Sequence, residues 1–567
     1  MPASAATLDP ASVQRTRVAG CLAFVASFAL TTAALLSFQP AHAAGLGLLA
    51  PADCAKATYP SLAWTVCEAR NVAATGQNPL GAGPLTAGVV AETFAYQKAR
   101  AQALLADPER RPNPNPCSTV LLCPVDPRLQ QWTANDGLVE RVLYTSRSGA
   151  TISGRVWATR TGPAKRPGVV IVNGSIVGFE EIYWFAAQSL AKAGFVVMTF
   201  DAQGEGNSDQ FGAHPDQLEA AFAGTPVLGL LGPKPAAGFG LGGNGLPFYD
   251  GGADALDFML STPSQPFVPV PSRTSGTSHA DKQARRVAAG LNAAHNPLHA
   301  LLDPTRIGLA GHSYGAVAAS WLAQHDPRVR TAVAWDSLCV PVSPAPDEIA
   351  AFTFAPVNRL AGAVPGGLLY GLPVPCFGAP AGPAPAITKP ALGINGDYLV
   401  AGIPYVKPPR PQEKAAASFA YSAAGVDTGN ITIRGATHFD FNDVPLVLPA
   451  SRRGIDLVTW YTVAWFAKYL QNDPLADRML MSTRWRNDAA AAKALPAGEP
   501  NVYSWHYRSR LSITQANGQR FQCEDLRKGC AGQVPAANDC GATPYAFASV
   551  ANGPTQPATA ACSAPTP

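Results

Sequence analysis

Short, continuous apolar runs alternate with segments of helical periodicity from about residue 168 to residue 470. The apolar runs are "GVVIV", "FVVMTFD", "RIGLAGH", "TAVAWD", "PALGING" and "NITIRGA". The helical segments include "FEEIYWFAAQSLAKAG", "GADALDFMLS", "YGAVAASWLAQHD" and "LVTWYTVAWFAKYL". Strands that lack polar alternation are covered on both faces, and helical crossovers between parallel strands provide that cover. The pattern predicts an α/β fold with a mostly parallel sheet and helices on both faces.

The regions around this pattern suggest further divisions of the chain. We predict an N-terminal extension at residues 44–130, a main domain at residues 131–475 and a Cys-containing C-terminal tail at residues 476–567. The main domain opens with "LVERVLYTS" and "TISGRVWAT", which alternate on either side of Gly149 as the strands of a hairpin do.

The N-terminus has the features of a secretory signal peptide. Two arginines precede the apolar run "VAGCLAFVASFALTTAALLSF", and "AHA" at residues 41–43 is a small-x-small cleavage sequence. We expect residues 1–43 to be removed from a bacterial protein that is secreted or periplasmic and not stably inserted in a membrane. An uncleaved membrane anchor is the alternative, because the apolar run is about as long as a membrane span.

The chain has 11 cysteines, and loss of Cys21 with the leader leaves an even number. In an oxidising compartment an even number predicts paired disulfides. The spacings suggest Cys54–Cys67, Cys117–Cys123 and Cys339–Cys376, with Cys523, Cys530, Cys540 and Cys562 stapling the tail. The cysteines and histidines do not show zinc spacing, so no metal site is expected.

Charge and glycine patterns argue against two other classes of function. The net charge is +4 without a basic block, so nucleic-acid binding is not expected. Gly238, Gly240 and Gly243 match G-x-G-x-x-G, but the flanking strand and helix of a dinucleotide site are missing from the pattern. No cofactor is expected.

The segment "AGHSYGA" at residues 310–316 follows the apolar run "RIGLA" and opens a helix whose first residues are small. This is the context of a nucleophile elbow, in which a serine on a strained strand-to-helix turn projects above the sheet. Ser313 is the candidate nucleophile. The alternative is a serine that merely caps the helix.

A serine hydroxyl becomes a nucleophile when an imidazole accepts its proton and a carboxylate orients that imidazole. These groups follow strand ends in the chain order serine, acid, histidine. His438, which follows "NITIRGAT", is the candidate base. Asp397, after the glycine turn of "PALGING", is the candidate acid, and Asp336 at the end of "TAVAW" is the alternative.

The oxyanion of a tetrahedral intermediate requires two backbone N–H donors. Tyr314, directly after the nucleophile, is expected to supply one. The other is assigned to Ser175, because the Asn-Gly-Ser loop after "VVIV" can turn inward.

Two loops at strand ends carry separate expectations. Residues 337–386, rich in Pro, Gly and Ala, are predicted to form a lid over the site, with Cys339 and Cys376 pinning its two ends. The carboxylates of "DAQGEGNSD", residues 201–209, are expected to hold loops together rather than to react.

The stretch from about Thr151 to Leu470 resembles the α/β-hydrolase superfamily. Within it, "AGHSYGA", "FVVMTFD", "RGATHFDFN" and "YTVAWFAKYL" are similar to bacterial cutinase and triacylglycerol-lipase-like serine esterases of the dienelactone-hydrolase-related branch. The resemblance implies an eight-stranded sheet and a triad that acts on esters without a cofactor. The chain departs from those enzymes at Ser175, where they carry an aromatic residue, and at "WDSL", where they carry a tryptophan.

The expected function is that of a secreted serine hydrolase that cleaves carboxylic esters through an acyl-enzyme, on a small-molecule, lipid or polyester substrate. An acyltransferase would use the same triad, with an alcohol in place of water. A prolyl-oligopeptidase-like peptidase is a further alternative, although nothing suggests its propeller domain. A non-catalytic binding protein on this fold would be expected to have lost a triad residue.

Overall fold

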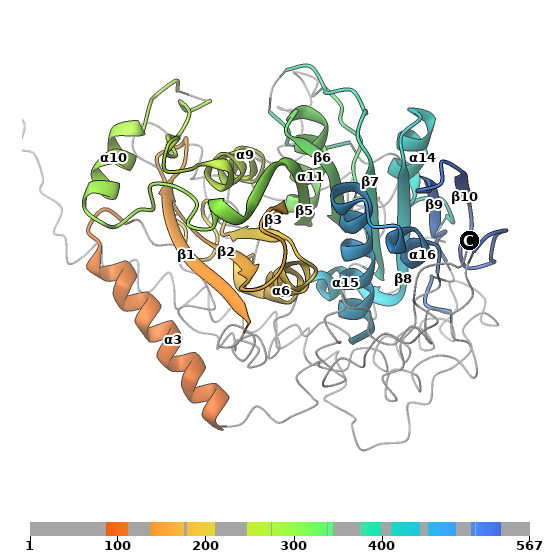
Figure 1. Cartoon of the computed structure of the whole chain (residues 1–567), viewed down its shortest axis with the longest axis horizontal. Helices are drawn as coiled ribbons and strands as arrows, with labels where there is room; N and C mark the ends of the chain where they lie inside the picture. The colour runs from red at the N-terminus through yellow and green to blue at the C-terminus, as the bar shows by residue number, and fades with distance from the viewer. Residues whose placement is uncertain are drawn as a thin grey trace, which may run out of the picture.

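The structure is a computed structural model, and it describes residues 87–110, 136–174, 178–209, 246–273, 275–336, 338–343, 375–376, 378–380, 382–398, 410–442, 452–482, 501–504 and 506–533. The expected signal peptide and most of the predicted lid lie outside these residues. The described part of the chain is a mixed α/β fold built on a ten-stranded sheet (Figure 1).

The strands lie in the order β1-β2-β4-β3-β5-β6-β7-β8-β9-β10. Neighbours from β4 to β8 in this order pair in parallel, whereas the pairs at the two ends are antiparallel. The bounds are β1 Gly137–Thr145, β2 Thr151–Thr159, β3 Arg166–Val172, β4 Val196–Phe200, β5 Leu302–His312, β6 Val329–Trp335, β7 Ala391–Tyr398, β8 Thr428–Thr437, β9 Arg510–Thr514 and β10 Arg520–Cys523. The predicted mostly parallel sheet is confirmed.

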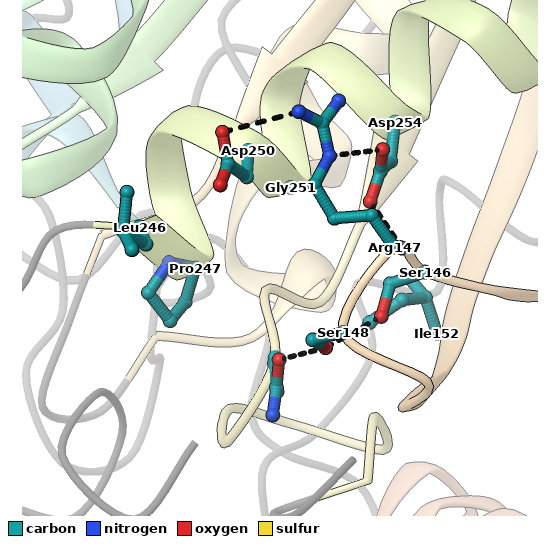
Figure 2. A pocket seen from close by; sticks show the side chains of 10 residues that line it. Ser146, Arg147, Ser148, Ile152, Leu246, Pro247, Asp250, Gly251 and Asp254 are labelled. Carbon is teal, nitrogen blue, oxygen red and sulfur yellow. Dashed lines mark hydrogen bonds and ion pairs between the residues drawn. The ribbon is translucent and has the colours of Figure 1, made fainter. Parts of the chain in front are cut away.

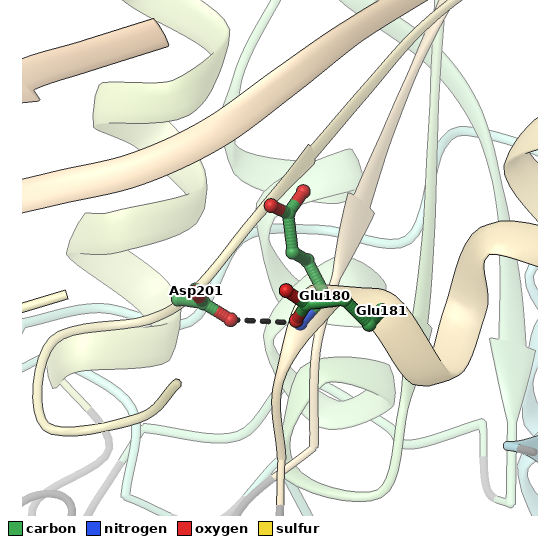
Figure 3. A group of neighbouring side chains, drawn as sticks. All are labelled: Glu180, Glu181 and Asp201. Atoms are coloured by element: carbon green, nitrogen blue, oxygen red, sulfur yellow. Dashed lines mark hydrogen bonds between the residues drawn. The ribbon is translucent and has the colours of Figure 1, made fainter. Parts of the chain in front are cut away.

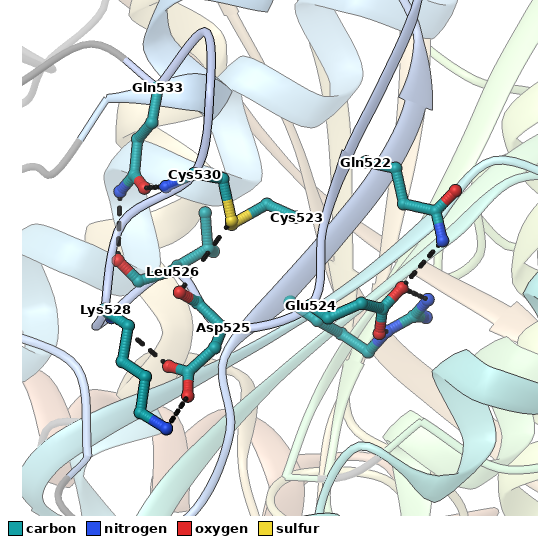
Figure 4. The surroundings of a disulfide bond; sticks show 9 residues. Gln522, Cys523, Glu524, Asp525, Leu526, Lys528, Cys530 and Gln533 are labelled. Atoms are coloured by element: carbon teal, nitrogen blue, oxygen red, sulfur yellow. Dashed lines mark hydrogen bonds and ion pairs between the residues drawn. A yellow bond between two sulfur atoms is a disulfide. The ribbon is translucent and has the colours of Figure 1, made fainter.

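The sheet has ten strands instead of the eight that the resemblance implies, because the predicted tail adds two. β9 pairs antiparallel with β8, and β10 pairs antiparallel with β9. A disulfide between Cys523 and Cys530 closes the turn after β10 (Figure 4). This tail hairpin therefore belongs to the main sheet, at the opposite end from β1 (Figure 1).

The predicted hairpin around Gly149 is formed by β1 and β2, which pair along their full length. Gly149 has φ of 84°, a backbone conformation that glycine adopts without strain. The N–H of Ser146 donates to the carbonyl of Ala150 at 2.8 Å and closes the turn.

Helices cover both faces of the sheet, as predicted. On β3, Val169 and Ile171 belong to one buried cluster and Val170 and Val172 belong to the other, so both faces of the strand are apolar. Helices α6 (Trp184–Lys192) and α15 (Arg452–Phe466) contribute to the first cluster, and α9 (Leu246–Leu260) and α11 (Tyr314–His325) contribute to the second. This two-sided burial explains why the strands lack polar alternation.

The other helical elements are shorter or peripheral. Their bounds are α3 Ala87–Ala106, η3 Glu180–Tyr183, α10 Ala280–Ala288, η4 His299–Leu301, α14 Ala416–Ala423, η5 His438–Phe441, the π-helical η6 Ala467–Gln471 and α16 Leu475–Met481. Within the described ranges, no helix has both the length and the apolar character needed to cross a membrane.

Helix α3, from the predicted N-terminal extension, is tied to the main domain by buried charges. Arg100 on α3 forms an ion pair with Glu181, and its side chain is almost fully buried. Arg155 on β2 donates to both Glu180 and the Tyr96 hydroxyl, and its guanidinium lies 4.6 Å from the Trp184 ring. The helix is held by these contacts at the β1 end of the sheet (Figure 1).

Replacing Arg155 with Met tests this buried charge pair. Glu180 is completely buried, so the variant leaves its carboxylate without the charge that offsets it. We expect the free energy of unfolding in urea to fall by about 3–5 kcal/mol. Arg285→Met is the matched control, because Arg285 pairs with Glu109 at the surface and its side chain is 60% exposed; here we expect a change of under about 1 kcal/mol. Equally small losses in both variants would contradict the anchoring role.

Candidate active site

Ser313 lies on the turn between β5 and α11, as the motif predicts. Its φ of 57° and ψ of −120° are strained for a residue with a side chain. Its N–H donates to the carbonyl of Trp335 at 3.0 Å, which attaches the turn to the end of β6. Its side chain makes no capping hydrogen bond to α11, so the alternative of a simple helix cap is not supported.

The two glycines of the motif are required by the close approach of backbones around the turn. A Cβ on Gly311 would lie 2.1 Å from the carbonyl oxygen of Gly315. A Cβ on Gly315 would lie 2.2 Å from the carbonyl oxygen of Val172 at the end of β3. No side chain fits at either position, so α11 can start directly above the carboxyl ends of β3 and β5.

His438 is the first residue of η5 and follows β8 directly. The preceding Thr437 forms a capping box with Asp440: Thr437 Oγ1 accepts from the Phe439 N–H, and Asp440 Oδ2 accepts from the Thr437 N–H. This arrangement ends the strand at Thr437 and fixes the backbone that carries His438.

The carboxylate that meets His438 is Asp336, the alternative acid. His438 Nδ1 lies 2.6 Å from Asp336 Oδ2, and the Asp336 side chain is completely buried. Asp336 directly follows β6 with φ of 48°, and its N–H donates to the carbonyl of Ile394. Because β6 is the neighbour of β5, Ser313 and Asp336 follow adjacent strands.

Asp397, the preferred candidate for the acid, is placed differently from the expectation. The expectation placed Asp397 on a loop beyond its strand, but β7 continues through Asp397 to Tyr398. Asp397 is thus buried within the strand, and its carboxylate interacts electrostatically with Lys414.

Strained backbone is concentrated at this site. Among the described residues, the non-glycine positions with positive φ are Ser313, Asp336 and Asn472. Two of these belong to the candidate triad. Such strain persists only where the surrounding structure imposes it, and it gathers at functional sites.

Lys414, which the sequence analysis did not single out, is a buried amine that interacts electrostatically with Asp336. It donates to the carbonyl of Gly396 and lies 4.7 Å from the centre of the Tyr507 ring. Burial lowers its pKa from the ordinary 10.5 to about 8, although the Asp336 and Asp397 carboxylates favour the charged form. No sequence pattern marks this lysine, since its role depends on contacts between distant segments.

The two expected oxyanion donors have different outcomes. Tyr314 is the first residue of α11, and its buried ring stacks on Phe248 at 4.8 Å. Backbone N–H groups in the first turn of a helix point toward its N-terminal end, which here is the Ser313 turn. Ser175 lies outside the described residues. Gly174 before it donates its N–H to the Tyr183 hydroxyl at 3.0 Å.

The predicted disulfide between Cys339 and Cys376 is present. Cys339 N–H and Ser320 Oγ on α11 are joined by a hydrogen bond, so the start of the insertion after β6 is attached near the elbow helix. The predicted lid between the two cysteines lies largely outside the described residues, as do Cys54, Cys67, Cys117, Cys123, Cys540 and Cys562.

A pocket between the β1–β2 turn and α9 is lined by charged side chains that pair with one another (Figure 2). Arg147 projects from the turn between two aspartates of α9, with Nε 2.8 Å from Asp254 and Nη1 3.3 Å from Asp250. Arg273 also donates to Asp250. None of the triad residues lines this pocket, and its ion pairs fasten the hairpin to α9.

Three carboxylates lie close enough together to be considered for a metal: Glu180, Glu181 and Asp201 (Figure 3). Asp201 accepts from the N–H groups of Glu180 and Asn207, both at 2.7 Å. The Glu180 oxygens accept from Arg155 and Thr199, and Glu181 pairs with Arg100. Protein donors thus engage all three carboxylates, and Asp201 confirms the expectation that its loop carboxylates hold loops together.

A scan against protein-family models found no match, and a search of curated proteins found no relative.

Lys414 gives a pH prediction. Between about pH 8 and pH 10.5 the folded amine is deprotonated while the unfolded amine keeps its proton, so deprotonation favours the folded state as pH rises. Across this window we expect wild type to gain up to about 3 kcal/mol of unfolding free energy relative to Lys414→Met. Urea denaturation at several pH values measures the difference. Lys98→Met, at an exposed position on α3, should track wild type; identical pH slopes in all three proteins would contradict the burial of a titrating amine.

Proposed function

We propose that this protein is a secreted α/β-hydrolase that cleaves carboxylic esters with a triad of Ser313, His438 and Asp336. The observation that carries the proposal is the hydrogen bond of 2.6 Å between His438 Nδ1 and Asp336 Oδ2, at the same sheet edge as the strained Ser313 turn. Ser313, Asp336 and His438 directly follow β5, β6 and β8. In open α/β sheets the site lies at the carboxyl ends of the strands, which is where these three residues are.

The sheet supports the α/β-hydrolase assignment. A serine on a strand-to-helix turn, followed along the chain by an acid and then a histidine, is the arrangement of that fold. β9 and β10 are then additions of this chain to the eight strands that the resemblance implies. Two disulfides among the described residues, Cys339–Cys376 and Cys523–Cys530, are consistent with an oxidising compartment.

In the proposed reaction His438 Nε2 removes the proton from Ser313 Oγ as the oxygen attacks the ester carbonyl. His438 Nδ1–H donates to Asp336, which fixes the tautomer and stabilises the imidazolium that forms. The Tyr314 N–H and a donor from the loop after Gly174 would bind the oxyanion. The imidazolium then protonates the departing alcohol, which leaves Ser313 acylated. Water, deprotonated by His438, releases the acid.

Ser313 is tested by labelling and substitution. A fluorophosphonate probe should label Ser313, and Ser313→Ala should lose the label and about 10⁴–10⁶ of turnover on nitrophenyl esters. Ser320→Ala is the control, because Ser320 lies on the same helix and is hydrogen-bonded to the carbonyl of Ala316; it should label normally. Peptide mass spectrometry that places the adduct on another serine would overturn the assignment.

The acid is tested by a pair of isosteric substitutions. Asp336→Asn should reduce turnover by about 10³–10⁴, because the amide cannot hold His438 in the productive tautomer. Asp397→Asn should stay within about tenfold of wild type, since in this proposal Asp336 and not Asp397 orients the base. Thermal unfolding of both variants separates misfolding from lost chemistry. The reverse pattern would return the role of acid to Asp397.

A further inference from the structure

A buried set of hydrogen bonds runs between the loop after β3 and the backbone of His438. The Gly174 N–H donates to Tyr183 Oη at 3.0 Å. Tyr183 Oη lies 2.9 Å from His312 Nδ1, and His312 Nε2 lies 2.9 Å from the carbonyl oxygen of His438. Tyr183 and His312 are only 1% and 2% exposed.

The direction of each hydrogen bond follows from its partners. The His438 carbonyl can only accept, so His312 Nε2 carries a proton. Burial and the neighbouring His438 keep the pKa of His312 well below its usual value, so the ring is neutral and Nδ1 has a free lone pair. Tyr183 Oη already accepts from Gly174 and therefore donates its own proton to Nδ1. Every donor thus has an acceptor, and the proton arrangement is unique.

The same contacts place both rings against the candidate triad. His312 directly precedes Ser313, and its ring centre lies 4.4 Å from that of His438. The Tyr183 ring stacks on Trp335, the residue before Asp336, with centres 6.2 Å apart. Phe441 of η5 also stacks on His312, with centres 5.8 Å apart. The rings are therefore wedged between the segments that carry the serine, the acid and the base.

We propose that Tyr183 and His312 are positioning residues that hold the backbone of Gly174, just after β3, and the backbone of His438 in a fixed relation to Ser313. The inference rests on the proposed serine-hydrolase function, which needs an oxyanion donor near the end of β3 and a base on η5. The role goes beyond packing. A shift of either segment would misplace a reacting group while substrate contacts elsewhere are kept. Therefore kcat should fall and KM should stay nearly unchanged.

Tyr183→Phe is the first test, because it removes one hydroxyl and keeps the ring. We expect kcat on a nitrophenyl ester to fall by about 10- to 100-fold with KM within about twofold of wild type. Tyr461→Phe is the matched control, because the Tyr461 hydroxyl is also buried. It forms hydrogen bonds with the Tyr503 hydroxyl at 2.7 Å and the carbonyl of Ser482 at 3.2 Å, and these partners do not belong to the segments that carry the candidate triad. It should lose comparable thermal stability and keep kcat.

A graded pair at His312 keeps the inference falsifiable if one variant folds poorly. His312→Gln retains an amide N–H near the position of Nε2 for the His438 carbonyl but has no acceptor at the position of Nδ1 for Tyr183, whereas His312→Phe has neither. The expected order of kcat is wild type, His312→Gln, then His312→Phe, with KM nearly constant. In nitrogen NMR of the wild type, His312 should show the neutral Nε2–H tautomer.

The outcomes separate the two proposals. A wild type that neither reacts with fluorophosphonate nor hydrolyses esters removes the proposed function and this inference with it. A wild type that does both, with Tyr183→Phe and Tyr461→Phe equal in kcat, overturns the positioning role alone. A charged His312 or an Nδ1–H tautomer would also overturn it.

Discussion

The site depends on a steric constraint at one crossing point, where the first turn of α11 lies against the ends of β3 and β5. Glycines at 311 and 315 let main-chain atoms approach to distances that any side chain would prevent. This close approach coincides with the strained backbone of Ser313, which has φ of 57° and ψ of −120°. Hydrogen bonds fix the candidate groups around this crossing. The Asp336 N–H donates to the carbonyl of Ile394 on β7, and the His438 carbonyl accepts from His312, the residue before the serine. The Gly174 N–H donates to Tyr183, which is hydrogen-bonded to His312.

The described part of the protein also buries several charged side chains, and opposite charges accompany them. Arg155 and Arg100 face Glu180 and Glu181, Arg147 lies between two aspartates, and Lys414 lies among the carboxylates behind the base. Such groups contribute little net stability compared with apolar packing, but removing one partner of a buried pair strongly lowers the free energy of unfolding. They specify how the hairpin, α3, α9 and α14 attach to the sheet more than they add to the stability of the core.

The parts of the fold that sequence could predict are those with local signals. The strands and helices between residues 168 and 470 follow from periodicity, and the elbow follows from five consecutive residues with a strand before them. The acid could not be chosen this way: the glycines of "GINGDY" suggest a turn, whereas pairing with β8 carries β7 on to Tyr398. His312, Tyr183 and Lys414 have no local signature, because their roles arise from contacts between distant segments or within a buried cluster. The tail strands do have a local signal, the Asn-Gly at 517–518 between "LSIT" and "RFQC".

The tail hairpin also changes the exposure of the sheet. Without β9, the start of β8 would be an open edge, and a strand with unpaired N–H and C=O groups is a template for pairing with other chains. Among the described residues, the outermost strand at this end of the sheet is the four-residue β10, which has an arginine at one end and a disulfide at the other. A short, charged and cross-linked strand is a poor template for such pairing. The C-terminal hairpin thus covers the sheet edge next to β8, the strand that leads to His438, and protects it from pairing with other chains.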